Sequence, residues 1–216
     1  LEAQGLHPLW ATVLIYGVAM VVILALRPQA LGQLLRTPAL WVLVLASGTT
    51  NAAFNWAVTI GDVVRVVLLF YLMPLWAVLL ARLLLNEPLG AATLARAALA
   101  LAGALVILWP RDGAGWPLPR TLAEWLGVVG GFTFALNNVM LRREAERSEA
   151  ARALAMFVGG ALVSLLVALA LSSAGRMPGL PAPSWGWIGG ALVLGALFLA
   201  SNLALQYGAA RLPANT

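Results

Sequence analysis

The run VVRVVLLFYLMPLWAVLLARLLL, residues 63–85, decides the fold class of this chain. A helix needs about 20 mostly apolar residues to cross the hydrocarbon layer of a bilayer. Strands of a membrane barrel instead alternate apolar and polar residues over about 10 positions. Because this run is apolar on all sides, it predicts a membrane-spanning helix.

Six comparable apolar blocks accompany this run, at residues 9–26, 38–58, 93–109, 122–141, 152–172 and 185–205. Of the 216 residues, 62% are hydrophobic and 10% are charged, against about 25% charged residues in soluble domains. A soluble globule of this size could not bury so much apolar surface. The sequence therefore predicts an all-α membrane protein, a multi-span helical bundle with seven spans and short loops.

The scarcity of reactive side chains argues against an enzyme. The chain has no cysteine and one histidine, His7, so thiolate and multi-histidine metal sites are excluded. No carboxylate lies in the middle of an expected span. This absence argues against a pair of acid and base groups for catalysis, and it favours uniport or exchange over proton-coupled transport. We expect no cofactor and no metal. The arginines are scattered between apolar blocks, so they indicate membrane topology and no nucleic-acid partner.

The arginines also predict an orientation, because cytoplasmic loops carry the positive excess. If the N-terminal end of the chain lies outside, nine arginines fall on the inner side and four on the outer side. Seven spans then place the C-terminal end in the cytoplasm. The chain starts with Leu1 and stops just after a loop, so we expect it to be a fragment of a longer protein in a bacterial cytoplasmic (inner) membrane.

A weak internal repeat appears when the chain is shifted by 151 positions. Residues 50–57 then align with residues 201–208, and each copy has a hydroxyl, an asparagine, a second amide and an aromatic residue. The two copies are an odd number of spans apart, so equivalent helices would cross in opposite directions, as in an inverted repeat of five helices. Chance similarity is the alternative.

Three segments resemble the EamA-like branch of the drug/metabolite transporter (DMT) superfamily. They are YLMPLWAVLLARLLLNEPL at 71–89, the stretch 97–110 ending in Trp109-Pro110, and FTFALNNVMLRR at 132–143. They are similar to that family's fourth, fifth and sixth helices. The resemblance implies a ten-helix carrier of two inverted halves, represented here by helices two to eight. Residues 1–110 would then end the first repeat, and residues 111–216 would begin the second.

Amides inside the expected spans are the main candidates for substrate binding. Asn51 and Asn55 lie four residues apart and so share one face of a helix. An amide facing lipid would lose hydrogen bonds that nothing there replaces, so both should face the protein interior. They could cradle a substrate with Trp56 as a wall, or they could be interhelical contacts of about 0.6 kcal/mol each.

Further amides extend this prediction. Asn137 and Asn138 are also candidates, but adjacent residues point about 100° apart, so we expect only one of them at a cavity. The repeat adds a mirrored surface of Asn202, Gln206 and Tyr207.

Residues 62–87 contain candidates for gates and hinges. Arg65 could pair with Asp62 at the outer surface, or it could anchor a substrate carboxylate. Tyr71 and Pro74 share a face at mid-span, where proline kinks a helix and could form a hinge or a fixed bend. Glu87 is expected to make a helix-end or gating contact.

These features favour a secondary transporter that exports or exchanges small metabolites, such as amino acids or related compounds, by alternating access. Its expected partners are a small molecule and the lipid bilayer, with a homodimer as an open alternative. Efflux of amphipathic drugs by the same fold and a non-transporting membrane subunit are the competing hypotheses.

Overall fold

The computed structural model describes residues 5–88, 90–109 and 118–209, with the backbone alone at 93, 96, 107, 108 and 202–209. This part of the chain contains helices and no strand, so the predicted all-α class is confirmed. The helices are α1 (Pro8–Leu26), α2 (Gln29–Arg36), α3 (Pro38–Ile60), α4 (Val63–Phe70), α5 (Met73–Leu85), α6 (Ala91–Leu108), α7 (Leu122–Arg143), α8 (Glu149–Ser173) and α9 (Trp185–Ala209).

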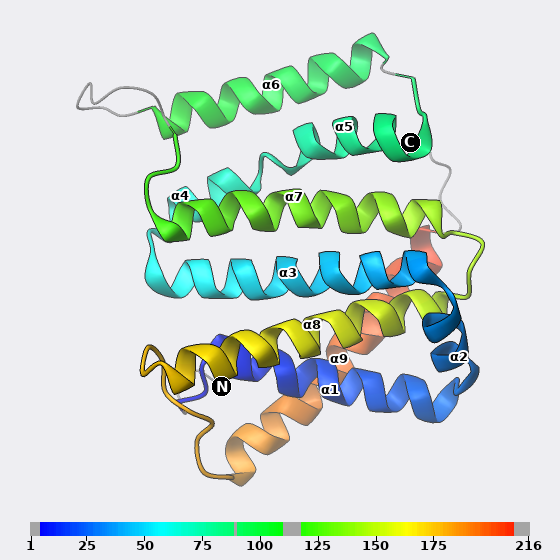
Figure 1. Ribbon diagram of the computed structural model, residues 1–216, viewed down its shortest axis with the longest axis vertical. Coiled ribbons are helices and arrows are strands. Elements are labelled where there is room, and N and C mark those ends of the chain that lie inside the picture. Colours follow the sequence, from blue (N-terminus) through cyan, green and yellow to red (C-terminus); the bar gives the residue numbers. More distant parts are fainter. Residues whose placement is uncertain (1–4, 89, 110–117, 210–216) are drawn as a thin grey trace.

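The long helices lie side by side in a layer (Figure 1). In Figure 1 the order from one edge is α6, then the α4–α5 pair, α7, α3, α8 and α1, with α9 crossing beside α1. Helix α3 packs against both α7 and α8, and these two contacts are the most extensive in the bundle. Side chains of α3 are therefore placed to reach both neighbours.

The helix ends are set by local polar groups. The Asp62 carboxylate accepts the backbone N–H of Val64 at 2.8 Å and so caps α4. Thr121 and Ser148 cap the starts of α7 and α8, because their hydroxyls accept backbone N–H groups of the first turns. Helix α5 ends at Asn86, which adopts the left-handed conformation with a φ of 55°. We call the bundle end near Asp62 and Thr121 the Asp62 end, and the opposite end the Arg142 end.

Backbones approach closely where α3 crosses α8. A methyl group added at Gly159 would overlap the Val44 carbonyl oxygen and lie 2.8 Å from the carbonyl carbon. Between α7 and α4, a methyl group at Gly131 would lie 2.5 Å from the Phe70 carbonyl oxygen. Glycine at these positions lets neighbouring helices touch along their backbones.

Two features differ from the sequence-based expectation. Residues 29–36 were expected to belong to a connecting loop, but they form α2, which turns by 97° into α3. Its apolar Ala30 and Leu34 are buried, which explains why so short a segment is helical. The run 63–85 was expected to be one kinked span, but it is two helices separated at residues 71–72. Pro74 has no N–H to donate to the Phe70 carbonyl, so the helix is interrupted just before it.

Three segments are long and apolar enough to cross a membrane: Pro8–Leu26, Val63–Leu85 and Glu149–Ser173. The bent pair of α2 and α3 makes a fourth if it is counted as one span, and Ala97–Val106 and Trp185–Ser201 are shorter apolar helices. These assignments cover the described residues and rest on length and composition.

Candidate functional site

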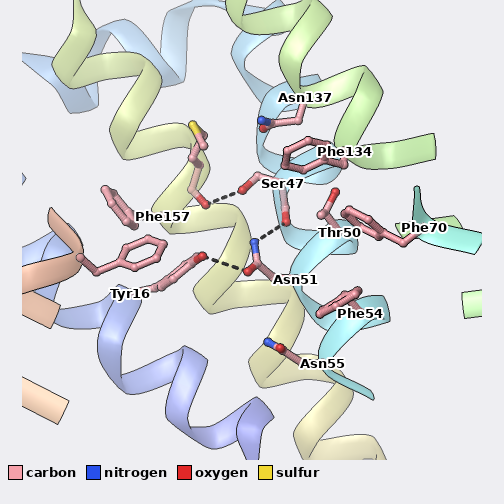
Figure 2. Close-up of a pocket in the computed structure, with 12 residues that line it drawn as sticks. Tyr16, Ser47, Thr50, Asn51, Phe54, Asn55, Phe70, Phe134, Asn137 and Phe157 are labelled. Carbon is pink, nitrogen blue, oxygen red and sulfur yellow. Dashed lines mark hydrogen bonds between the residues drawn. The ribbon is translucent and has the colours of Figure 1, made fainter. Parts of the chain in front are cut away.

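A cavity of about 250 Å³ lies inside the bundle, between side chains of α1, α3, α4, α7, α8 and α9 (Figure 2). Its described lining consists of uncharged residues: Tyr16, Ser47, Thr50, Asn51, Phe54, Asn55, Phe70, Phe134, Asn137, Met156, Phe157 and Phe198. Helices α1, α3 and α4 from the first half of the chain and α7, α8 and α9 from the second half supply these residues.

Helix α3 supplies the polar strip of this cavity. Five of its residues line the cavity, at positions 47, 50, 51, 54 and 55. This is the i, i+3, i+4, i+7, i+8 spacing of one helical face. Four of the five carry a hydroxyl or an amide, so one face of α3 brings hydrogen-bonding groups into an otherwise apolar space.

The two amides of this strip are already engaged with neighbouring groups. The Tyr16 hydroxyl of α1 donates to Asn51 Oδ1 at 2.9 Å, and Asn51 Nδ2 donates to the Ser47 carbonyl at 2.9 Å. Asn55 Nδ2 donates to Thr12 Oγ1 of α1 at 2.8 Å. Both amides therefore line the cavity and also join α3 to α1, as the interhelical-contact hypothesis expects.

Hydroxyl groups join α3 to its other two neighbours. Thr50 Oγ1 lies 2.9 Å from Thr133 Oγ1 of α7. Ser47 Oγ donates to the Met156 carbonyl of α8 at 3.1 Å. These contacts hold the polar strip at a defined position between α7 and α8.

Asn137 differs from the amides of α3. Asn137 is only 4% exposed, and its Oδ1 has no hydrogen-bond partner within the part of the chain that the structure describes. Figure 2 shows Asn137 beside Phe134 at one edge of the cavity. The adjacent Asn138 is exposed on the other face of α7. As expected from the angle between adjacent residues, only one of the pair reaches the cavity.

Aromatic rings form two opposite walls. The first wall, which we call the Phe70 wall, joins α3, α4 and α7 through Phe54, Phe70 and Phe134. The ring centroids of Phe54 and Phe134 lie 5.0 and 5.5 Å from that of Phe70. The second wall, the Tyr16 wall, joins α1, α8 and α9 through Tyr16, Phe157 and Phe198, with centroids 5.3 to 6.1 Å apart. The labelled residues of the two walls stand on opposite sides of Asn51 in Figure 2. Such spacings are those of favourable aromatic pairs.

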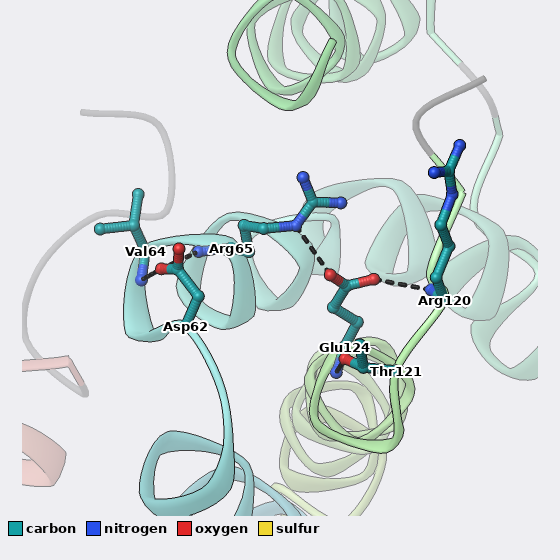
Figure 3. A network of polar contacts seen from close by, with 6 residues as sticks. All are labelled: Asp62, Val64, Arg65, Arg120, Thr121 and Glu124. Carbon is teal, nitrogen blue, oxygen red and sulfur yellow. Dashed lines mark hydrogen bonds and ion pairs between the residues drawn. The ribbon is translucent and has the colours of Figure 1, made fainter. Parts of the chain in front are cut away.

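Arg65 lies at the Asp62 end, outside the cavity lining. In place of the expected ion pair with Asp62, its Nε donates to Glu124 Oε1 of α7 at 2.7 Å (Figure 3). The Asp62 carboxylate caps α4 instead, and Glu124 Oε2 accepts the backbone N–H of Arg120 at 2.6 Å. The Glu124 side chain is 10% exposed and that of Arg65 is 34% exposed. This pair fastens α4 to α7.

A second ion pair, at the Arg142 end, joins α7 to the residues that follow α5. The Glu87 carboxylate, just after α5, binds the guanidinium of Arg142 on α7. The two side chains are 41% and 61% exposed, so this pair is more open to water than the first. Together the two pairs join α4 and the residues that follow α5 to α7.

Residues 3–109 match the family model described as the EamA-like transporter family. Residues 3–109 belong to the EamA-like transporter family. No curated protein and no solved structure matches the chain. EamA-like proteins are transporters, so the matched region identifies a membrane transporter of the DMT type, and the chain is a multi-pass membrane protein. The resemblance of segment 71–89 and of residues 97–109 is thereby confirmed, whereas segment 132–143 lies outside the matched residues and stays a prediction.

Besides Arg65, two predicted binding residues of the EamA-like region, Trp56 and Tyr71, lie away from the cavity. Trp56 packs against a cluster around Leu9, Ala52 and Leu171, because it is turned about 100° from Asn55 along α3. Tyr71 ends α4 and is 56% exposed. It is the residue before it, Phe70, that lines the cavity.

The side chains of Asn202, Gln206 and Tyr207 lie outside the described residues. Pro74 stands in the first turn of α5, directly after the interruption, where a hinge or fixed bend was expected.

Several lining residues carried a signal in the sequence that was missed. Ser47 and Thr50 continue the helical face of Asn51 and Asn55 toward the start of the same block. Tyr16 is a hydroxyl within an apolar block. The phenylalanine residues carry no such signal, because apolar side chains in a membrane span face lipid as readily as a cavity.

Proposed function

We propose that the protein is a secondary transporter that exports or exchanges small metabolites by alternating access, with the cavity beside α3 as its substrate site. The observation that carries this proposal is a cavity lined by amides, hydroxyls and aromatic rings inside a multi-pass bundle whose first half is EamA-like. Small-molecule sites combine mostly apolar walls with a few polar groups in this way.

The depth of the polar groups supports this role. Asn137 lies six residues before the end of α7, which is roughly 9 Å along the helix axis. Asn55 lies five residues before the opposite end of the bundle, on α3, at roughly 8 Å. If α3 and α7 cross the bilayer as this proposal requires, both amides lie within the hydrocarbon layer of about 30 Å, where polar groups mark substrate and ion pathways.

The size of the cavity favours a small metabolite. Sites for drug-sized ligands measure about 300–1,000 Å³, whereas this cavity measures about 250 Å³. Efflux of amphipathic drugs is the second candidate function, and the aromatic walls favour it. The volume makes it the weaker one.

Helix packing supports two inverted halves, residues 1–110 and 111–216. Helix α8 runs opposite to α1, because Trp10 near the start of α1 bonds to Pro178 beyond the end of α8 at 3.3 Å. In the proposed repeat, α1 is equivalent to α8 and α3 is equivalent to α9. The contact between α3 and α8 should therefore have an equivalent between α9 and α1. Both contacts are present.

The interrupted run 63–85 supplies the moving element of this proposal. Opening the Asp62 end separates Arg65 from Glu124, and opening the Arg142 end separates Glu87 from Arg142. The break before Pro74 lets α4 and α5 change direction independently. The excess of arginine at the Arg142 end supports a cytoplasmic location for that end and for the C-terminal end of the chain, in a bacterial inner membrane.

Counterflow measurements test this function. The full-length protein would be reconstituted in liposomes with a panel of labelled amino acids, uncharged metabolites and dyes. We expect counterflow of a small metabolite, lost in Asn51→Leu and retained in Asn138→Leu, the same substitution at an exposed position. Counterflow of dyes alone would support drug efflux. No flux of any compound would support a non-transporting subunit.

A further inference from the structure

We propose that the cavity binds an uncharged, flat aromatic molecule that carries an N–H or O–H group, and that Asn137 Oδ1 accepts the hydrogen bond from this group. This inference rests on the proposed function, because it names the substrate class of the same site. It assigns to Asn137 the role of selecting a hydrogen-bond donor.

The first step is the state of Asn137. Its Oδ1 is buried and has no partner among the described residues. Buried acceptors are nearly always paired, because leaving one unpaired costs free energy. In the described part of the chain, three other buried side-chain atoms also have no partner: Trp76 Nε1, Arg152 Nε and Ser164 Oγ. None of these three residues lines the cavity, whereas Asn137 does.

The second step is the state of the other polar groups in the cavity. Both ends of the Asn51 amide are bonded, to the Tyr16 hydroxyl and to the Ser47 carbonyl. The Ser47 hydroxyl donates to Met156, and Asn55 Nδ2 donates to Thr12. A ligand that bonded to the Asn51 amide, to the Ser47 hydroxyl hydrogen or to Asn55 Nδ2 would compete with existing contacts. Asn55 Oδ1 is not among the buried unpaired atoms of the described residues, so water can satisfy it. A ligand that donates to Asn137 Oδ1 displaces none and satisfies an unpaired acceptor.

The third step is the shape of the space. The Phe70 wall and the Tyr16 wall present aromatic rings from two sides, with the polar strip of α3 between them (Figure 2). A flat ring gains contact area and favourable ring geometry against such walls. The twelve described lining side chains are uncharged. A charged ligand would lose its hydration without meeting an opposite charge from them, so an uncharged ligand fits best.

Indole and indene provide a matched pair of probes. The two molecules have the same ring shape, but indene has CH₂ where indole has N–H. Binding to the purified full-length protein in detergent would be measured by isothermal titration calorimetry. We expect indole to bind roughly 5- to 10-fold more tightly than indene, the range that one hydrogen bond supplies. This comparison uses the unaltered protein and does not depend on any variant.

Substitution then assigns the preference to one residue. Asn137→Leu removes the acceptor and keeps a side chain of similar size, so it should weaken indole binding roughly 5- to 10-fold and leave indene binding unchanged. Asn138→Leu, on the exposed face of the same helix turn, should keep the full preference.

Three results would overturn the proposal. Equal affinity for indole and indene in the unaltered protein would show that no acceptor is available. A preference retained in Asn137→Leu would place the acceptor elsewhere. Tighter binding of tryptophan or tetramethylammonium than of indole would contradict an uncharged substrate. Counterflow separates these failures from failure of the proposed function, because flux of another metabolite without indole binding sinks only this inference.

Discussion

Replacing Gly159 with alanine should destabilise the bundle by pushing α3 away from α8. The added methyl group would overlap the Val44 carbonyl oxygen and lie 2.8 Å from the carbonyl carbon and 3.0 Å from the Val44 Cα. Non-bonded carbon atoms normally stand about 3.5–4.0 Å apart. Because all three obstructing atoms are backbone, no side chain can rotate to make room. The helices must therefore separate by roughly 1 Å.

The size of the effect follows from two opposing contributions. Overpacking of a close contact costs about 1–3 kcal/mol. Alanine in place of glycine within a helix returns up to about 1 kcal/mol through its higher helix propensity. We therefore expect Gly159→Ala to lower the free energy of unfolding by about 0–2 kcal/mol, which is about 1–3 kcal/mol below a Gly→Ala change that gains the helix propensity without the clash. Since α3 carries Asn51 into the cavity, counterflow should fall as well.

Gly17→Ala is the matched control for this experiment. A methyl group at Gly17, on α1, would meet no atom within 4 Å. It should therefore leave stability unchanged or raise it by up to about 1 kcal/mol. Thermal unfolding of the purified protein in detergent, followed by size-exclusion chromatography, would compare the two variants. If Gly159→Ala unfolds at the same temperature as Gly17→Ala, the direct backbone contact between α3 and α8 is refuted.

Three further predictions concern the Arg65–Glu124 ion pair, the break before Pro74 and the orientation of the chain in the membrane. Glu124→Gln should cost about 1–2 kcal/mol of stability, between the values for exposed and buried ion pairs. It should cost nothing more in a protein that already carries Arg65→Gln; additive losses in the double-mutant cycle would show that the two side chains do not interact. Pro74→Ala should restore the helical hydrogen bond to residue 70 and slow counterflow, whereas an unchanged rate would exclude a hinge there. For orientation, a single cysteine at Asp62 should react with an impermeant maleimide added outside intact cells, and one at Arg143 only after permeabilisation. The reverse pattern would invert the assigned orientation.

The long helices were predictable because apolar composition and turn residues fix them locally, but of the seven expected spans only three, or four with the bent α2–α3 pair, are long and apolar enough to cross a membrane within the described residues. The run 63–85 and its six companions are helical in the structure, and the match of residues 3–109 confirms the family resemblance. Helix α2 was missed because it is short and carries polar residues, Gln29, Gln33 and Arg36, so its sequence is typical of a loop between two apolar blocks. Its helical state depends on burying Ala30 and Leu34 against other helices, which a local pattern does not reveal.

The site was only partly predictable. Asn51, Asn55 and Asn137 were found because an amide in hydrocarbon must face inward, and this rule acts on each residue alone. The partner of Arg65 could not be found in the same way. Asp62 is three residues away in sequence, but Glu124 is reached only because α4 packs against α7. The aromatic walls likewise depend on which face of each helix meets its neighbour.

The central claim is that the cavity beside α3 is a water-accessible substrate site, and cysteine labelling at Ser47 tests it most directly. The chain contains no cysteine, so Ser47→Cys introduces a single thiol into the cavity by a conservative change. Ser164→Cys is the matched control, because Ser164 is fully buried in α8 and does not line the cavity. We predict that a small charged methanethiosulfonate modifies the thiol at 47, that transported substrate protects it, and that the thiol at 164 stays unmodified. A thiol at 47 as unreactive as the one at 164, or one that substrate does not protect, would contradict the account.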